Sequence, residues 1–279
     1  MLSLKAEWKL VLEGIAMGES PRWHAGRLWF CDWGAQEIIA VTQAGEAEAM
    51  LVVPFGLPFS IDWLPDGQLL VVSGREGLLY RQQTDGSLAV YADLTPISSG
   101  WNEIVIDGRG NAYVNSAAAI ALVTPDGVAQ KVADGGAFPN GMAITPDNRS
   151  LVMAESMGHR LTAFDIAFDG SLSKRRTWAE LNGGVPDGIC IDASGAVWYA
   201  DVPNRQCVRV REGGEILQIL ELDRGGFACM LGGTDGKTLF ALASEWRGME
   251  KMAEVAQMRT GQLLAMEVSL AGAGWPARE

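Results

Sequence analysis

Short apolar runs, each preceded by a polar turn, recur along the whole chain. Six copies are found, at intervals of about forty residues. They are HAGRLWFCD (24–32), PDGQLLVVS (65–73), DGRGNAYVN (107–115), PDNRSLVMAE (146–155), DASGAVWYAD (192–201) and TDGKTLFALA (234–243). Each pairs a Gly, Asp or Asn turn with residues that favour extended backbone, which is typical of a β-hairpin.

A second, weaker hairpin signal lies between these copies. It is seen at QTDGSLAVYA (83–92), TPDGVAQKVA (124–133), AFDGSLSKRRTW (167–178) and REGGEILQIL (211–220). Two hairpins per unit make four strands, which is the content of one propeller blade. A blade cannot bury both faces of its sheet alone, so blades stack around an axis and cover one another.

The pattern therefore predicts an all-β chain, a six-bladed β-propeller with four antiparallel strands per blade, and one domain over 1–279. We expect EWKLVLE (7–13) to complete the last blade beside QLLAMEV (262–268). A β-sandwich is a weaker alternative because it does not require a forty-residue period. The best helical segment, WRGMEKMAEVAQM (246–258), is short and fits an insertion in a loop.

The net charge, the apolar runs and the cysteine spacing limit the classes of partner and the compartment that we expect. The net charge of −12 disfavours nucleic acid and anionic membranes, both of which would be repelled. No stretch approaches the roughly 20 apolar residues that span a bilayer. The four cysteines have no paired spacing, so we expect reduced, buried thiols and a cytoplasmic protein. A monomer and a small homo-oligomer are both compatible with the sequence.

Four blades place a polar side chain at one repeat position. Counting back eight residues from the turn reaches Asn102 (from Gly110), Asn140 (from Asn148) and Asp187 (from Gly195), and counting back seven from Gly26 reaches Glu19. In the other two blades the slot falls on Phe59 or Ser60 and on Ala228. This slot precedes the innermost strand, so the four polar side chains should converge at the mouth of the central channel.

Two carboxylates and two amide oxygens form a hard, all-oxygen ligand set, which suits Ca²⁺, Mg²⁺ or Mn²⁺. A simpler interpretation is that PNG (139–141) and PDG (186–188) are only turns and that Glu19 is a solvated loop carboxylate. Turn formation does not explain why these residues share a repeat position. The shared position favours a metal site.

At these residues the sequence resembles the senescence-marker/gluconolactonase (regucalcin-like) family of six-bladed propellers. The matching segments are GESPRW (18–23), WNEIVID (101–107), FPNGMAITPDNRSLVMAES (138–156) and PDGICIDASGAVWYAD (186–201). The resemblance implies that Glu19, Asn140 and Asp187 bind one divalent cation. Ca²⁺ is the expected ion, with Mg²⁺, Mn²⁺ and Zn²⁺ as alternatives. It also implies that Asn102 contacts substrate or a metal-bound water.

The chain also departs from that family's pattern. Gly100 stands where sugar lactonases commonly carry Arg, and the segment NSAAAIA (115–121) is apolar where some members supply a polar contact. We expect Trp101, Phe59 and Phe138 near the mouth, with Trp101 as a substrate contact beside Asn102. These features favour a lactone or ester that is more apolar than gluconolactone.

Other hydrolytic chemistries lack their residues. No G-x-S-x-G elbow is present, and the two histidines, His24 and His159, lie in different blades and cannot form a three-histidine zinc site. Metal-assisted hydrolysis remains, with Asp187 as ligand and general base. The alternatives are a non-catalytic calcium- or ligand-binding propeller and a phosphotriesterase that uses the same metal site. A WD-type interaction propeller would need a Gly-His…Trp-Asp repeat that the chain lacks.

Overall fold

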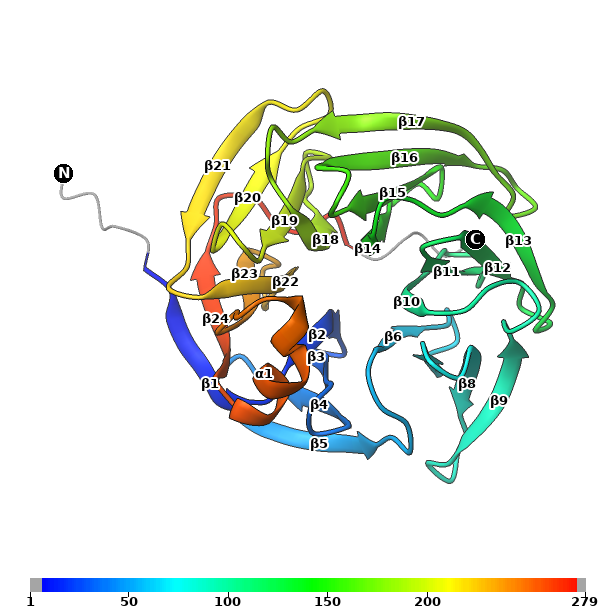
Figure 1. The fold of residues 1–279 in the computed structure, drawn as a ribbon, viewed down its shortest axis with the longest axis horizontal. Coiled ribbons are helices and arrows are strands. Elements are labelled where there is room, and N and C mark those ends of the chain that lie inside the picture. The colour runs from blue at the N-terminus through cyan, green and yellow to red at the C-terminus, as the bar shows by residue number, and fades with distance from the viewer. Residues whose placement is uncertain (1–6, 275–279) are drawn as a thin grey trace.

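The computed structural model describes residues 7–274, and almost all of its regular secondary structure is β-strand. Six sheets of four antiparallel strands surround a central axis (Figure 1). The innermost strands of neighbouring sheets contact one another around this axis. The chain is therefore a six-bladed β-propeller, as the repeat predicts.

The first three blades follow one another along the chain. Blade one contains β2 (Gly18–His24), β3 (Arg27–Asp32), β4 (Glu37–Val41) and β5 (Ala47–Val52). Blade two contains β6 (Phe59–Trp63), β7 (Leu69–Ser73), β8 (Leu78–Gln82) and β9 (Leu88–Asp93). Blade three contains β10 (Trp101–Ile106), β11 (Ala112–Ser116), β12 (Ala119–Val123) and β13 (Ala129–Asp134).

The remaining blades continue this order until the ring closes. Blade four contains β14 (Pro139–Ile144), β15 (Ser150–Glu155), β16 (Arg160–Ile166) and β17 (Leu172–Glu180). Blade five contains β18 (Pro186–Ile191), β19 (Val197–Asp201), β20 (Gln206–Val210) and β21 (Ile216–Glu221). Blade six contains β22 (Gly225–Gly232), β23 (Thr238–Ser244), β24 (Gly261–Glu267) and β1 (Lys9–Ile15).

Blade six is assembled from both ends of the chain. Its outermost strand, β1, pairs antiparallel with β24, and the register runs from Lys9 opposite Ala265 to Ile15 opposite Gly261. The predicted closure by 7–13 and 262–268 is confirmed. The first strand of the chain therefore holds the last blade in place.

The core consists of apolar clusters that lie between neighbouring blades, one at each of the six interfaces. Trp101 and Leu70, for example, are buried together between blades two and three. The four cysteines are buried and form no disulfide within the described chain. Blades cover one another as the repeat argument requires.

The repeated turns owe their conformation to Asp and Gly side by side. In the turn before β7, Gly67 has φ +88°, a conformation that glycine adopts without strain. The neighbouring Asp66 accepts a hydrogen bond on Oδ1 from the amide of Gln68 at 3.0 Å. The same arrangement recurs at Asp85 and Ser87.

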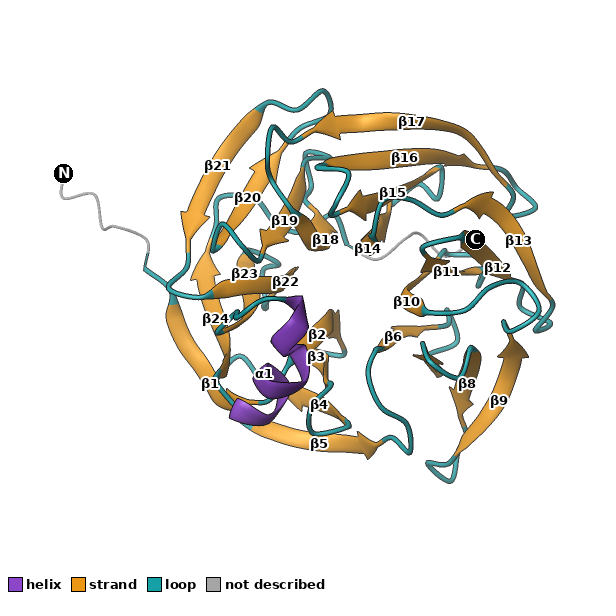
Figure 2. Ribbon diagram, viewed as in Figure 1, coloured by secondary structure: helices purple, strands orange, loops and turns teal. Residues whose placement is uncertain are grey.

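The helical segment lies in the connection from β23 to β24, as predicted for 246–258. It comprises η1 (Met249–Lys251) and α1 (Met252–Met258) and covers one end of the ring (Figure 2). Its buried residue Val255 packs against Met17 and Phe227, which precede or begin the innermost strands of blades one and six. Over residues 7–274 no helix has the length and apolar character needed to cross a bilayer.

Candidate active site

The four polar residues found by counting along the repeat do share one structural position. Each is the second residue of an innermost strand: Glu19 in β2, Asn102 in β10, Asn140 in β14 and Asp187 in β18. In the other two blades this position holds Ser60 in β6 and Gly226 in β22. The register inferred from the sequence is therefore confirmed in the four blades with a polar residue at this position. In blade two the counterpart is Ser60 rather than Phe59, and in blade six it is Gly226, so the prediction of Ala228 is wrong by two residues.

The backbone is irregular at this position. In the four blades that carry Glu19, Asn102, Asn140 and Asp187, the innermost strand changes its pairing register with the next strand near that residue. The shifts lie between Glu19 and Arg22, Trp101 and Ile104, Pro139 and Met142, and Pro186 and Ile189. The pairing of β22 with β23 shifts as well, whereas that of β6 with β7 is regular. A shift of this kind turns a side chain away from the regular sheet face. Ser20, next to Glu19, also has a strained φ of +50°.

The glycines of the PNG and PDG segments are not turn residues. Gly141 and Gly188 lie inside β14 and β18. A Cβ atom on Gly141 would stand 2.6 Å from the carbonyl oxygen of Asp187, and one on Gly188 would stand 2.4 Å from Cβ of Ala228. Glycine is needed here because the innermost strands approach one another closely around the axis. The interpretation of these segments as simple turns is wrong.

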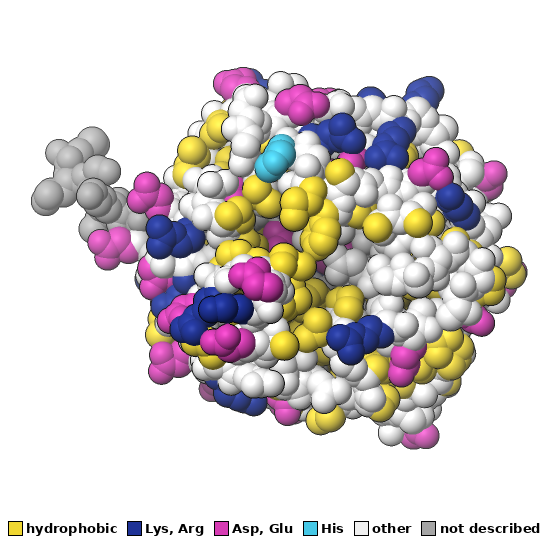
Figure 3. All heavy atoms as spheres, viewed as in Figure 1, with side chains coloured by type: hydrophobic (Ala, Val, Ile, Leu, Met, Phe, Trp, Pro, Cys, Tyr) yellow, Lys and Arg dark blue, Asp and Glu magenta, His cyan; other side chains and the backbone are white. Residues whose placement is uncertain are grey.

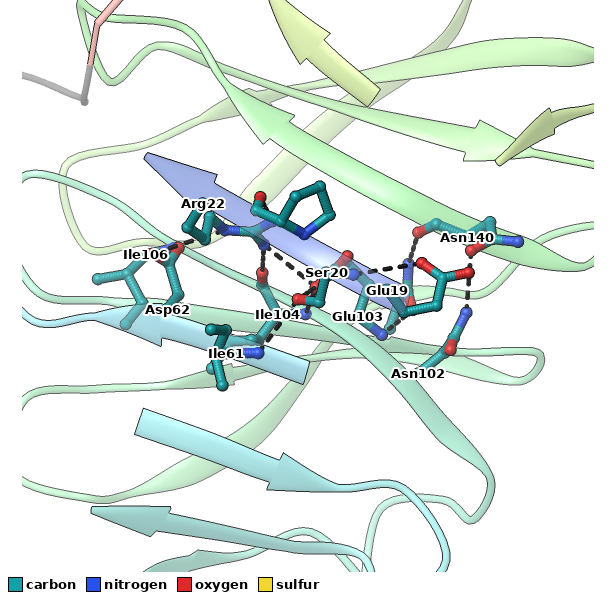
Figure 4. A network of polar contacts seen from close by, with 12 residues as sticks. Glu19, Ser20, Arg22, Ile61, Asp62, Asn102, Glu103, Ile104, Ile106 and Asn140 are labelled. Atoms are coloured by element: carbon teal, nitrogen blue, oxygen red, sulfur yellow. Dashed lines mark hydrogen bonds and ion pairs between the residues drawn. The ribbon is translucent and has the colours of Figure 1, made fainter. Parts of the chain in front are cut away.

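Hydrogen bonds connect the site across blades three, four and five. Asn102 Nδ2 donates to Oδ1 of Asn140 at 3.2 Å, and Asn140 Nδ2 donates to Oγ of Ser156 at 3.4 Å. Ser156 Oγ in turn donates to the carbonyl oxygen of Pro186, the residue immediately before Asp187, at 2.7 Å. Figure 4 shows Glu19 directed toward the same space as Asn102 and Asn140.

The two carboxylates of the site repel each other inside the protein. Burial raises the pKa of Glu19 well above its ordinary value, and the charges of Asp187 and Glu103 raise it further. Burial likewise raises the pKa of Asp187, followed by the charges of Glu103 and Asp201. Asp187 Oδ1 is buried and has no hydrogen-bond partner among residues 7–274. Buried acceptors of this kind are costly unless a donor or a cation reaches them.

These residues fit a hard divalent cation. Oxygens of Glu19 and Asp187 supply negative charge, and Oδ1 of Asn140 keeps a second lone pair beside the hydrogen bond from Asn102. In the described chain no group of three or more His, Cys, Asp or Glu side chains is arranged to hold a metal. The donor set therefore depends on amide oxygen, which suits Ca²⁺ better than Zn²⁺.

A polar network beneath these residues was not foreseen from the sequence. Arg22 Nη2 lies 3.1 Å from Oε1 of Glu103 and donates to the carbonyl oxygen of Ile104 at 2.6 Å. Ser20 Oγ donates to the same carboxylate oxygen at 3.0 Å and accepts from the amide of Ile61 at 3.1 Å (Figure 4). The available signal was a carboxylate, Glu103, directly between Asn102 and the apolar run Ile104–Ile106 of WNEIVID.

Trp101 does not line the mouth. Its side chain is 0% exposed and lies in the cluster between blades two and three. Successive side chains of a strand point in opposite directions, so Trp101 faces the core when Asn102 faces the channel. Phe59 is buried for the same reason beside Ser60. The expectation that Trp101 and Phe59 lie at the mouth is therefore wrong, and we assign no substrate contact to Trp101.

Phe138 is exposed, as expected for a residue near the mouth. It is 43% exposed and has φ +60°, two residues before Asn140. Met157, which is 60% exposed, lies next to this segment because its amide donates to the carbonyl oxygen of Ala137 at 3.1 Å. Figure 3 shows a hollow at the centre of this face, with hydrophobic side chains around it and acidic side chains in its depth.

The two histidines lie outside the polar cluster. His24 ends β2 and stacks on Trp63, with the ring centroids 4.2 Å apart. His159 is exposed, and its Nδ1 is 3.0 Å from the carbonyl oxygen of Gly184. Their separation agrees with the expectation that neither belongs to a histidine metal site.

Comparison with known proteins matches the chain to one family. The family model described as the SMP-30/gluconolactonase/LRE-like region matches residues 17–245. The chain is 26% identical to a regucalcin of Xenopus laevis over 286 residues, covering 94% of this chain and 93% of that protein. It is 29% identical to a 6-deoxy-6-sulfogluconolactonase of Pseudomonas putida over 142 residues, which are 49% of this chain and 48% of that enzyme.

The sulfogluconolactonase match therefore spans about half the length of that relative. Among solved structures, a calcium-binding protein, regucalcin, from Agrobacterium tumefaciens superimposes with a TM-score of 0.81 at 19% identity. The superposition covers 98% of both chains. At this identity the likeness supports the propeller fold alone.

Proposed function

Given that this chain belongs to the SMP-30/gluconolactonase/LRE-like family, we propose that it is a metal-dependent hydrolase of a small lactone or ester. The observation that carries the proposal is the orphaned Oδ1 of Asp187, buried near the equally buried Glu19. The lactonase activity of the Pseudomonas putida relative gives the reaction class. We propose one cation, Ca²⁺ first, held by Glu19, Asn140 and Asp187.

The bound cation supplies polarisation of the substrate carbonyl and compensates the negative charge that develops on its oxygen. Asp187, as the general base, accepts the proton of the attacking water. Glu19 and Asn140 supply the other oxygen donors for the cation. The hydrogen bond from Asn140 Nδ2 to Ser156 Oγ fixes the orientation of the Asn140 side chain. Asn102, whose amide already reaches Asn140, orients the substrate or the water.

The rim favours an apolar substrate. Phe138 and Met157 expose apolar surface beside the Asn140 strand. Gly100 has φ +66° and carries no side chain with which to bind a sugar hydroxyl. We therefore propose an alkyl or aryl lactone over a polyhydroxylated one. Comparing kcat/KM for dihydrocoumarin and gluconolactone tests this choice, and a clear preference for gluconolactone would reverse it.

Turnover after metal removal is the decisive experiment. We expect EDTA to abolish lactone hydrolysis and Ca²⁺ to restore it, and Asp187→Ala to stay inactive with Ca²⁺ present. Asp66→Asn, in an exposed turn far along the sheet from the site, serves as the matched control and should keep full activity. Full activity after exhaustive chelation would refute the metal-dependent mechanism.

A non-catalytic calcium-binding protein is the second candidate, because the Agrobacterium relative is described as calcium-binding. Saturable Ca²⁺ binding with no turnover across a lactone and ester panel would favour it. A paraoxon assay on the same samples separates a phosphotriesterase from a lactonase.

A further inference from the structure

A second cavity occupies the opposite end of the central channel. Its volume is about 220 Å³, and its walls come from the later residues of the innermost strands, such as Ile106, Ile144 and Ile191. Glu19, Asn140 and Asp187 are second residues of such strands. Ile106, Ile144 and Ile191 each lie four residues further along their strands, so at about 3.3 Å per residue the two ends are roughly 13 Å apart. We call this space the rear cavity.

The walls of the rear cavity are mainly apolar. Met142 and Ile144 of β14 and Met230 of β22 line it, and the segment from Gly272 to Gly274 forms part of its wall. That segment is held by backbone hydrogen bonds from Gly272 to Gly236 and from Ala273 to Ile191, both 2.9 Å long. The described residues of this segment, two glycines and an alanine, carry no large side chain that could enter the space. A cavity of about 150 Å³ already holds a benzene molecule, so one ring compound fits.

Arg22 and Asp62 are the two charged residues among the described lining residues. Arg22 is engaged elsewhere, because its Nη2 binds Glu103 and the carbonyl oxygen of Ile104. Asp62 is 2% exposed and accepts hydrogen bonds from the amides of Trp63 and Ile106, both at 2.8 Å. Its ion-pair contact with Arg22 Nε, at 3.8 Å, is longer than a hydrogen bond.

Asp62 shares its counter-ion with Glu103. Arg22 Nη2 is hydrogen-bonded to Glu103, so one guanidinium serves two buried carboxylates and leaves a net negative charge. Figure 4 shows Asp62 on the far side of Arg22 from Glu19 and Asn140. A buried carboxylate is stabilised by a positive charge that also makes a hydrogen bond.

We propose that the rear cavity binds a small apolar amine, with the ammonium group on Asp62 and the hydrocarbon part against Met142, Ile144 and Met230. This site is separate from the proposed mouth site, because the Arg22–Glu103 pair lies between them. It requires neither a bound metal nor turnover. Burial raises the pKa of the Asp62 carboxyl to about 7, because the cost of desolvation exceeds the opposing effect of Arg22 at 3.8 Å.

Calorimetric titration of the chelated, full-length protein with benzylamine tests the proposal at neutral pH, where the amine is protonated. Benzyl alcohol is the neutral probe of similar shape. We expect saturable binding of benzylamine and at least about tenfold weaker binding of benzyl alcohol, as for a buried hydrogen bond to a charged group. Equal affinity for the two probes, or no saturable binding of benzylamine, would overturn the proposal.

Three variants locate the binding. Asp62→Asn should weaken benzylamine binding about tenfold and leave benzyl alcohol unchanged, whereas Ala143→Phe, which fills the cavity, should weaken both. Asp187→Asn, at the mouth, should change neither. Loss of benzylamine binding in Asp187→Asn, or competition by Ca²⁺ in the wild type, would place the amine at the mouth and refute the rear site.

A thiol reaction gives a readout on the wild-type protein, which decides the matter if Asp62→Asn fails to fold. Cys190 lines the rear cavity, whereas Cys31 is buried between blades one and two. We expect benzylamine to slow the modification of Cys190 by methyl methanethiosulfonate and to leave Cys31 unaffected, as measured by peptide mass spectrometry. Unchanged modification of Cys190 at saturating benzylamine would contradict the proposal.

Discussion

Arg22 of blade one reaches Glu103 of blade three, with Nη2 3.1 Å from Oε1 and both side chains buried. The pair joins the innermost strands of two blades that are separated along the ring by blade two. It neutralises Glu103, whose charge raises the pKa of both Glu19 and Asp187. Its removal should therefore affect both folding and the site.

Arg22→Met should lower the free energy of unfolding by about 3–5 kcal/mol, because Glu103 would remain buried without its cation. Urea denaturation measures the change. The double variant Arg22→Met/Glu103→Leu should recover most of the loss. Arg27→Met removes an exposed ion pair with Glu48 and should cost no more than about 1 kcal/mol. An equal decrease in the free energy of unfolding for Arg22→Met and Arg27→Met would show that the buried Arg22–Glu103 pair stabilises the fold no more than an exposed ion pair does.

Gly141→Ala should disturb the site through the backbone. The added Cβ would meet the carbonyl oxygen of Asp187 at 2.6 Å, so we expect a loss of stability of about 1–3 kcal/mol and weaker Ca²⁺ binding. Gly56→Ala is the matched control, since a Cβ atom there has nothing within 4 Å and should change stability by less than about 0.5 kcal/mol. Thermal unfolding with and without Ca²⁺ measures both effects. Wild-type Ca²⁺ affinity in Gly141→Ala would contradict the close-approach argument.

Asp187→Asn should separate stability from function. The substitution removes one of two repelling buried charges, so the metal-free protein should unfold at a higher temperature than the wild type. The rise in Tm on adding Ca²⁺ should disappear, and lactone turnover should fall at least about 100-fold with the loss of the base. A variant that keeps the full Ca²⁺-induced rise would show that Asp187 is not a ligand.

Asp62 predicts a pH dependence of stability. Its folded pKa, about 7, lies above the ordinary value of 3.8, so folding is favoured while the group is protonated. The contribution is complete below about pH 4 and is lost as the pH rises through about 7. Asp62→Asn should therefore gain stability relative to the wild type over this interval, on the order of a few kcal/mol. Urea denaturation at several pH values measures the difference. A free energy of unfolding that changes equally with pH in the two proteins between pH 4 and 7 would contradict the raised pKa of Asp62.

The repeat made most of the fold predictable. Turn residues and apolar runs are local features, and a forty-residue period arranges them in only a few ways. The same period placed Glu19, Asn102, Asn140 and Asp187 at one position of the innermost strands, which the structure confirms. Their proposed role in metal binding and catalysis remains a prediction.

The wrong predictions and the features that were missed depend on the direction of side chains and on contacts with other blades. Trp101 was expected at the mouth with Asn102, although adjacent residues of a strand face opposite ways. The Arg22–Glu103 pair joins blades one and three, and no local pattern shows that these side chains meet. The rear cavity depends on how six strands and the segment near Gly272 leave space between them, and spacing along the sequence does not reveal such a space.

The pairing of β1 with β24 constrains how the protein can be made. During translation β1 leaves the ribosome before β2, yet its partner β24 emerges only after β2 to β23 have been synthesised. Until then the nascent ring has a gap bordered by unpaired strand edges, which invite association with other chains. A ribosome that stalls before Gly261 would therefore hold a product with most of its blades formed and the ring still open.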